Sequence, residues 1–235
     1  MNATKLIAAC ALAACTTSLF AQNSPYPPPQ NVLQLSASGT VEVQQDLLVM
    51  SLNTTREGAD AATVQNQLKV VLDGALAEAR KTAQPGQMDV RTGNFSLYPR
   101  YGRDGKISGW QGSAELVLEG RDFARISTAA ARIQGLTLGQ VSFGLSREQR
   151  ARVEGDAQSQ AIASFKAKAT ELAKGFGFAG YTLREVAVNA NDQGFTPRPR
   201  MMAMEAKAAA SDMPVPVEAG KSTVMVTVSG SVQLR

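Results

Sequence analysis

The chain has 235 residues, of which 44% are hydrophobic, 19% charged and 6% aromatic, a composition typical of a globular protein rather than of a disordered or fibrous one. It contains no histidine, which excludes imidazole-based zinc and haem sites and nucleophilic systems that use histidine as the base. The formal net charge is only +4 and no run of lysine and arginine stands out, so we expect no nucleic-acid partner.

Residues 1–21 have the features of a secretory signal peptide. Lys5 supplies the positive charge, an apolar run follows, and Ala21 precedes the expected cleavage site. As an alternative, residues 12–15 have the form of a lipoprotein cleavage box, which would make Cys15 the lipid anchor. No later stretch approaches the roughly 20 apolar residues of a membrane helix. We therefore expect an exported protein without a transmembrane helix in its mature chain or, in the alternative, a lipoprotein on an envelope membrane.

We expect cleavage after Ala21, because this residue follows the whole apolar run and residues 22–31 form a proline-rich spacer. The mature chain then starts at Gln22 and has lost both cysteines, so no disulfide stabilises it. Mass analysis of the N-terminal peptide of the exported protein tests this prediction. A diacylglyceryl-modified peptide that begins at Cys15 would contradict it.

The first half of the fold begins with two strands and a helix. Apolar and polar residues alternate strictly over residues 33–43, which predicts a half-buried strand, and a second strand is expected over residues 47–55. Asp60 is placed to cap a helix, and apolar residues then recur every three or four positions as far as Ala79. This spacing predicts one buried helix face.

Two further strands are expected over residues 89–98 and 107–119. The Asp104-Gly105 pair between them suits a tight hairpin turn. Asp122 is placed to cap a second helix, and a fifth strand is expected to end at Leu145.

A helix of nearly thirty residues follows. Ser146 with Gln149 resembles a capping box that opens it, and its apolar residues, including Phe165 and Phe176, are expected on the buried face. Gly155 inside this helix indicates a close helix contact or a bend.

The last two strands are expected over residues 181–189 and 224–234. The segment between them, residues 192–221, lacks strong periodicity and is interpreted as a mobile or partner-binding loop. It carries four methionines: Met201, Met202, Met204 and Met213. Thioethers bind Cu(I) and are readily oxidised, so a copper site and an oxidant sink are the alternatives to plain loop composition. We expect neither a metal nor a cofactor, and treat these residues as an oxidisable loop.

The order of these elements predicts an α+β fold. Over residues 46–145 they follow one another as βαββαβ, the ferredoxin-like unit. Residues 32–45 together with 146–235 supply the first strand, the long helix and the last two strands. We expect these to form a second, smaller α+β layer in which the first and last strands meet.

Several dispersed segments carry a family resemblance. These segments are Leu35–Val43, Ile107–Trp110, Arg121–Phe123, Val141–Ser146 and Pro214–Gly220. In them the sequence resembles the SIMPL-domain family of bacterial periplasmic proteins, over residues 32–235. The resemblance implies a periplasmic or outer-envelope protein, often linked to oxidative-stress defence and capable of self-association. It implies no catalytic residues, because the family has no agreed enzymatic activity.

Tyr98, Tyr101 and Trp110 flank the predicted hairpin turn and are the candidates for partner contact. Exposed aromatic side chains often anchor protein interfaces. Aromatic residues paired across a hairpin also pack locally, and this is the competing interpretation.

Three other patterns are more simply explained by structure. Residues 175–180 spell the dinucleotide fingerprint, but they follow a helix instead of opening one, so they are interpreted as a helix end. Glu115 and Glu119 share one strand face, and Lys166 and Lys168 lie beside a serine on the long helix. We expect a charged strand face and a solvated helix face.

We therefore predict an exported, non-enzymatic envelope protein that works by binding or self-assembly as a homo-oligomer, with open sheet edges and the hairpin as contact surfaces. The alternative is an enzyme that uses carboxylate, serine or lysine groups without histidine or cysteine.

Overall fold

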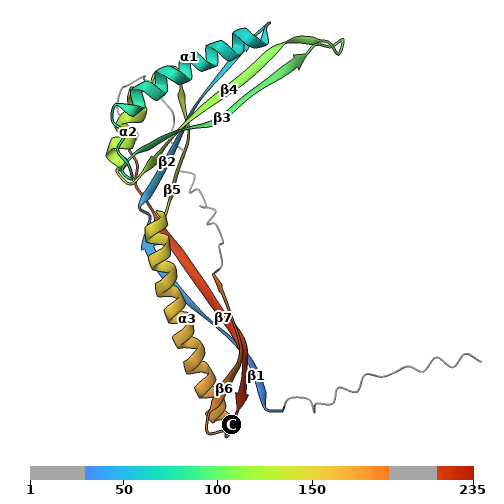
Figure 1. Cartoon of the computed structure of the whole chain (residues 1–235), viewed down its shortest axis with the longest axis vertical. Helices are drawn as coiled ribbons and strands as arrows, with labels where there is room; N and C mark the ends of the chain where they lie inside the picture. Colours follow the sequence, from blue (N-terminus) through green and yellow to red (C-terminus); the bar gives the residue numbers. More distant parts are fainter. Residues whose placement is uncertain (1–29, 191–215) are drawn as a thin grey trace, which may run out of the picture.

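The computed structural model describes residues 30–190 and 216–235. Within these ranges the chain forms two antiparallel sheets that lie end to end in an elongated molecule (Figure 1). The elements, in chain order, are β1 (Val32–Gln44), β2 (Leu47–Gly58), α1 (Ala61–Arg80), β3 (Asp89–Tyr101), β4 (Ile107–Gly120), α2 (Phe123–Arg132), β5 (Thr137–Gly144), α3 (Arg147–Gly175), β6 (Tyr181–Ala190) and β7 (Lys221–Leu234). None of these helices has the length and apolarity needed to cross a membrane.

The larger sheet has the strand order β3-β4-β2-β5, and each neighbouring pair is antiparallel. This order is that of the split βαβ unit, so the predicted ferredoxin-like topology is confirmed. α1 and α2 pack on one face of the sheet (Figure 1). Their apolar residues meet those of the strands in one core, in which Leu48, Leu68 and Leu116 are fully buried.

The first two helices start where the sequence predicts. The side chain of Asp60 accepts a hydrogen bond from the Thr63 amide at 2.7 Å, and that of Asp122 accepts one from the Arg125 amide at 3.0 Å. These backbone hydrogen bonds lower the pKa of both carboxyl groups. Because the folded-state pKa lies below the unfolded one, this stabilisation is present at neutral pH and is lost as the pH falls through the folded-state pKa.

The smaller sheet has the order β1-β7-β6, so the first and last strands pair as expected, with Val32 opposite Gln233. α3 packs on β1 and β7 and buries a row of small residues around Phe165. At Gly39 of β1 the helix comes so close that an added Cβ would stand 2.1 Å from the carbonyl oxygen of Ala157. This sheet and α3 form a second hydrophobic core.

One expectation about α3 is wrong. Phe176 is 64% exposed, because the helix ends at Gly175 and Ala173 occupies the last buried position. Of the two alternatives for Gly155, the close helix contact is contradicted, because nothing in the described chain lies within 4 Å of the position of a Cβ there. The bend stays a prediction.

The two sheets are connected at a joint formed by Gln45, Asp46, Ser146 and Gly220. The Asp46 carboxylate accepts hydrogen bonds from the Ser146 amide at 2.7 Å and the Ser146 hydroxyl at 2.6 Å, and lies 3.4 Å from the Arg121 guanidinium. Ser146 caps α3 as predicted, but its own amide donates to Asp46 instead of completing a capping box. The amide of Gln45 donates to the carbonyl of Gly220. Hydrogen bonds thus join the three chain segments that meet at the joint: the link between β1 and β2, the link between β5 and α3, and the residue before β7.

Candidate functional site

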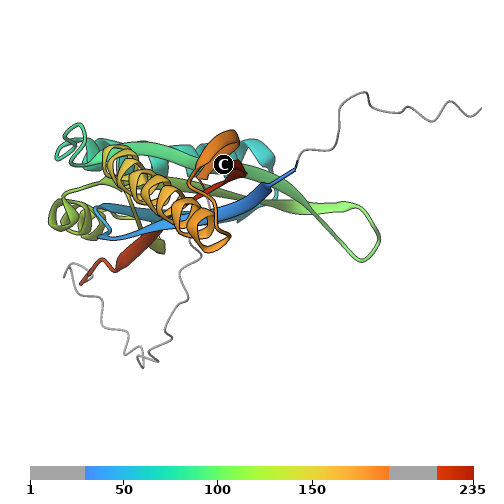
Figure 2. The same ribbon diagram turned by 90° about the horizontal axis from the view of Figure 1, so that it is seen from below.

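β3 and β4 form a long hairpin whose tip projects beyond the rest of the molecule (Figures 1 and 2). The turn lies where the sequence predicts it. The Gly102 amide donates to the Lys106 carbonyl at 2.8 Å, and Gly105 has a φ of 73°, which glycine adopts without strain. The Asp104 carboxylate accepts from the Lys106 amide at 3.2 Å and fixes the turn further.

The projecting part carries exposed apolar side chains, which we call the hairpin patch: Tyr98, Tyr101 and Ile107. The two tyrosines are each 65% exposed, and Ile107, which lies opposite Tyr101, is 53% exposed. Tyr98 projects from one face of the hairpin and Tyr101 from the other, so the patch occupies both sides of the tip. Large apolar side chains that project from a sheet contribute nothing to the core of their own chain. Such a patch is typical of a partner-binding surface.

The structure does not place the three aromatic residues on one face of the hairpin. Trp110 lies opposite Pro99, and successive residues of a strand point to opposite faces, so Trp110 and Tyr98 are on different sides, whereas Tyr101, two residues after Pro99, is on the side of Trp110. Trp110 is partly buried and packs against the core of the larger sheet. It is part of the packing that supports the hairpin.

Three of the charged side chains singled out in the sequence, those of Glu115, Glu119 and Lys168, each have a separate partner. The Glu115 carboxylate accepts from the Asn94 amide at 2.9 Å, where a bulge interrupts β3, and Glu119 lies 3.6 Å from the Arg91 guanidinium. Lys168 of α3 donates to a backbone carbonyl of β1 at 3.1 Å. Neither the bulge nor these partners could be identified from spacing alone.

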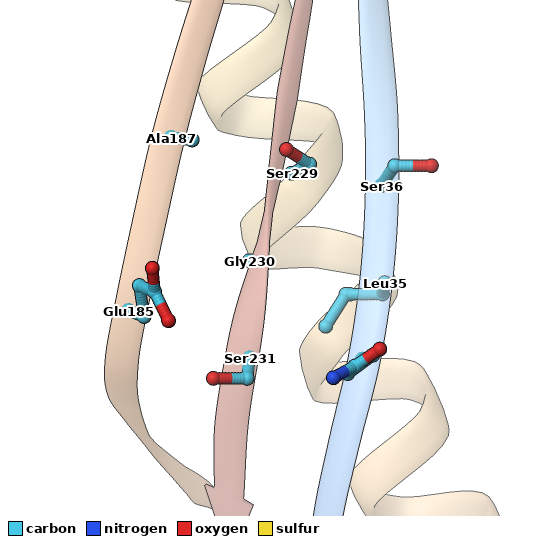
Figure 3. A pocket seen from close by; sticks show the side chains of 8 residues that line it. Leu35, Ser36, Glu185, Ala187, Ser229, Gly230 and Ser231 are labelled. Carbon is cyan, nitrogen blue, oxygen red and sulfur yellow. The ribbon is translucent and has the colours of Figure 1, made fainter.

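A shallow depression of about 470 Å³ lies on the smaller sheet (Figure 3). Its lining includes Ser36, Ser229, Ser231 and Glu185. The Ser231 hydroxyl and the Glu185 carboxylate point into the space between β6 and β7 (Figure 3). These groups can form hydrogen bonds with a polar ligand, but the depression is open and lies on a flat strand surface.

A larger groove of about 720 Å³ lies beside α1, lined by Val70, Val71 and Gly135. In the described part of the chain no group of three or more acidic or cysteine side chains could hold a metal ion. Each buried side-chain nitrogen and oxygen of these residues has a hydrogen-bond partner.

Several predicted features lie outside the described residues. They are the signal peptide with Ala21, the alternative lipid anchor at Cys15, and the oxidisable methionines Met201, Met202, Met204 and Met213. These stay predictions.

Comparison with known proteins finds a matching family model and, with low similarity, solved structures of another protein. Two solved structures of AtUAH, in complex with (S)-hydroxyglycine and with glyoxylate, are each 14% identical over 56% of this chain and 34% of theirs, with TM-scores of 0.25 and 0.24. The chain thus spans about a third of those proteins. No curated protein matches. The model of the family described as SIMPL, protein of unknown function (DUF541), matches residues 33–232, which include all seven described strands except the ends of β1 and β7. The protein is therefore a member of the SIMPL family.

Proposed function

We propose that this SIMPL protein is an exported, non-enzymatic envelope protein that works by self-assembly, with the hairpin patch as a contact surface. Its location rests on the N-terminal sequence, and a role in oxidative-stress defence rests on the family resemblance. The observation that carries the proposal is the hairpin itself: a projecting pair of strands whose tip exposes Tyr98, Tyr101 and Ile107.

The exposed apolar side chains of the hairpin patch favour binding to a partner on energetic grounds. Exposing large apolar side chains to water gains nothing for the folded monomer, whereas burying them against a partner stabilises the complex by about 25 cal/mol per Å² of apolar surface. Tyrosine is well suited to this role because its ring is rigid and its hydroxyl can still find a hydrogen-bond partner.

The double substitution Tyr98→Ser with Tyr101→Ser is expected to reduce the oligomer to smaller species without unfolding the chain. Loss of an aromatic anchor typically costs about 2 kcal/mol or more, which weakens association roughly thirtyfold. The fold is expected to survive because neither side chain belongs to a core. Light scattering across a concentration series measures the assembly, and circular dichroism measures the fold.

Val70→Ser is the matched control, because Val70 is 71% exposed on α1, away from the hairpin. This variant is expected to assemble like the wild type. A wild-type protein that is monomeric at every concentration would contradict self-assembly and favour the enzymatic alternative. Unchanged assembly of the double variant would instead show that the hairpin patch is not the contact.

A further inference from the structure

β6 is an outer strand of the smaller sheet and has only β7 as a neighbour within the described chain. No other described strand runs along its outer side in Figures 1 and 3. Within residues 30–190 and 216–235 no strand pairs with its main-chain groups on that side, which can therefore accept another strand.

β6 also carries an exposed apolar row, which we call the edge stripe: Leu183, Val186 and Val188. These side chains are 52%, 43% and 45% exposed. They lie opposite Val232, Gly230 and Val228, and so share the sheet face that α3 covers. The buried core residues on this face come from α3, β1 and β7, so the helix stops short of the stripe.

Two of the other sheet edges, those of β3 and β5, carry features that hinder pairing. β3 contains Pro99 and a bulge between Thr92 and Phe95, and the pairing of β5 with β2 shifts at Ser51. β1 pairs regularly with β7 along its length and is also an outer strand, but its apolar face is packed under α3. In β6 the pairing with β7 shifts between Leu183 and Glu185 and is then regular to Ala190, without proline or lysine. Because β6 alone combines such an edge with an uncovered apolar row, it gains the most apolar contact from pairing.

We propose that β6 pairs with β6 of a second copy of this chain, antiparallel and centred on Ala187. This inference rests on the proposed self-assembly and deepens it by naming the strand and register of one contact. In this register Val186 of each copy lies opposite Val188 of the other copy, so the same valine pair forms on both sides of Ala187. Opposed β-branched side chains stabilise antiparallel strands.

The charged residues of β6 are also compatible with this register. Glu185 meets Asn189 of the other copy and Arg184 meets Ala190, so no like charges are opposed. Both copies use the same surface, which closes a two-fold dimer and makes one six-stranded sheet from two three-stranded ones. A pairing this short lies at the small end of interfaces, which bury about 1,200 Å² or less, so the dimer is expected to be weak.

The register is tested by oxidative cross-linking of the full chain. Only a residue on the two-fold axis meets its own copy, so Ala187→Cys is expected to form an interchain disulfide, identified by mass spectrometry of the linked peptide. Asn189→Cys is the matched control on the same strand face. Its two copies would stand about 13 Å apart, too far for a disulfide, and its yield is expected to be at least tenfold lower. Equal yields at both positions, or none at position 187, would overturn the pairing.

Sedimentation equilibrium supplies a second measurement. Val188→Lys places a positive charge in the edge stripe and is expected to raise the dissociation constant of the dimer at least tenfold. The thermal melt of the chain is expected to stay unchanged, because Val188 is 45% exposed. The same cross-linking in the Tyr98→Ser/Tyr101→Ser background separates the two proposals. Cross-linking that persists there supports β6 pairing whatever the hairpin does, and its absence in both backgrounds overturns β6 pairing alone.

Discussion

Phe165→Ala is expected to lower the free energy of unfolding by about 3 to 5 kcal/mol, because it removes the largest side chain from the core beneath α3. Phe165 is 2% exposed, and its buried neighbours on the helix are all alanines, which cannot fill the space. No other fully buried residue that α3 contributes to this core is larger than alanine. Urea unfolding followed by circular dichroism measures the loss.

Phe176→Ala makes the same chemical change one residue beyond the end of the same helix. Because Phe176 is 64% exposed, its loss is expected to change stability by less than about 0.5 kcal/mol. Equal effects of the two substitutions would mean that the core does not lie where the structure places it.

Gly39→Ala is expected to destabilise the protein by about 3 kcal/mol, although it adds only one methyl group. The new Cβ would stand 2.1 Å from the Ala157 carbonyl oxygen and 2.6 Å from the Ala161 amide nitrogen, so backbone of α3 would have to move away from β1. A shift of a helix backbone loosens the whole row of buried alanines behind it. Thermal and urea melts give the size of the effect.

Gly155→Ala is the matched control, since it also adds one methyl group but into open space on α3. Alanine is the better helix former, so this variant is expected to be more stable by about 0.5 to 1 kcal/mol. Opposite signs for the two substitutions support the close approach at Gly39, and a stabilised Gly39→Ala protein would refute it.

Much of the fold could be predicted because local patterns agree with the tertiary structure. Alternation over residues 33–43 and 224–234 marks the two strands that pair, and Asp60, Asp122 and Ser146 all cap the helices that they precede. The element order then leaves few topologies, of which the ferredoxin-like one is observed for β2 to β5.

Alternation cannot show whether a strand face is covered. Val186 and Val188 have the same pattern as buried valines of β7, yet they are exposed because one helix is too narrow to span three strands. Trp110 and Tyr98 are both aromatic and close in the hairpin, but only strand pairing shows that they face opposite ways. The part played by Asp46 depends on a serine 100 residues away in the sequence.

The pairing of β1 with β7 has a consequence for the order in which the chain can fold. β1 is the first of the described elements to be synthesised and its partner β7 is the last. Val32 therefore cannot pair until Gln233 has been synthesised. During that interval the ferredoxin-like unit has all four of its strands, while the apolar face of β1 has no sheet to join. A contact that closes a loop of this length forms slowly. A chain interrupted before β7 therefore keeps the larger sheet but exposes both β1 and the alanine row of α3, which makes late truncations more prone to aggregation than their small loss of sequence suggests.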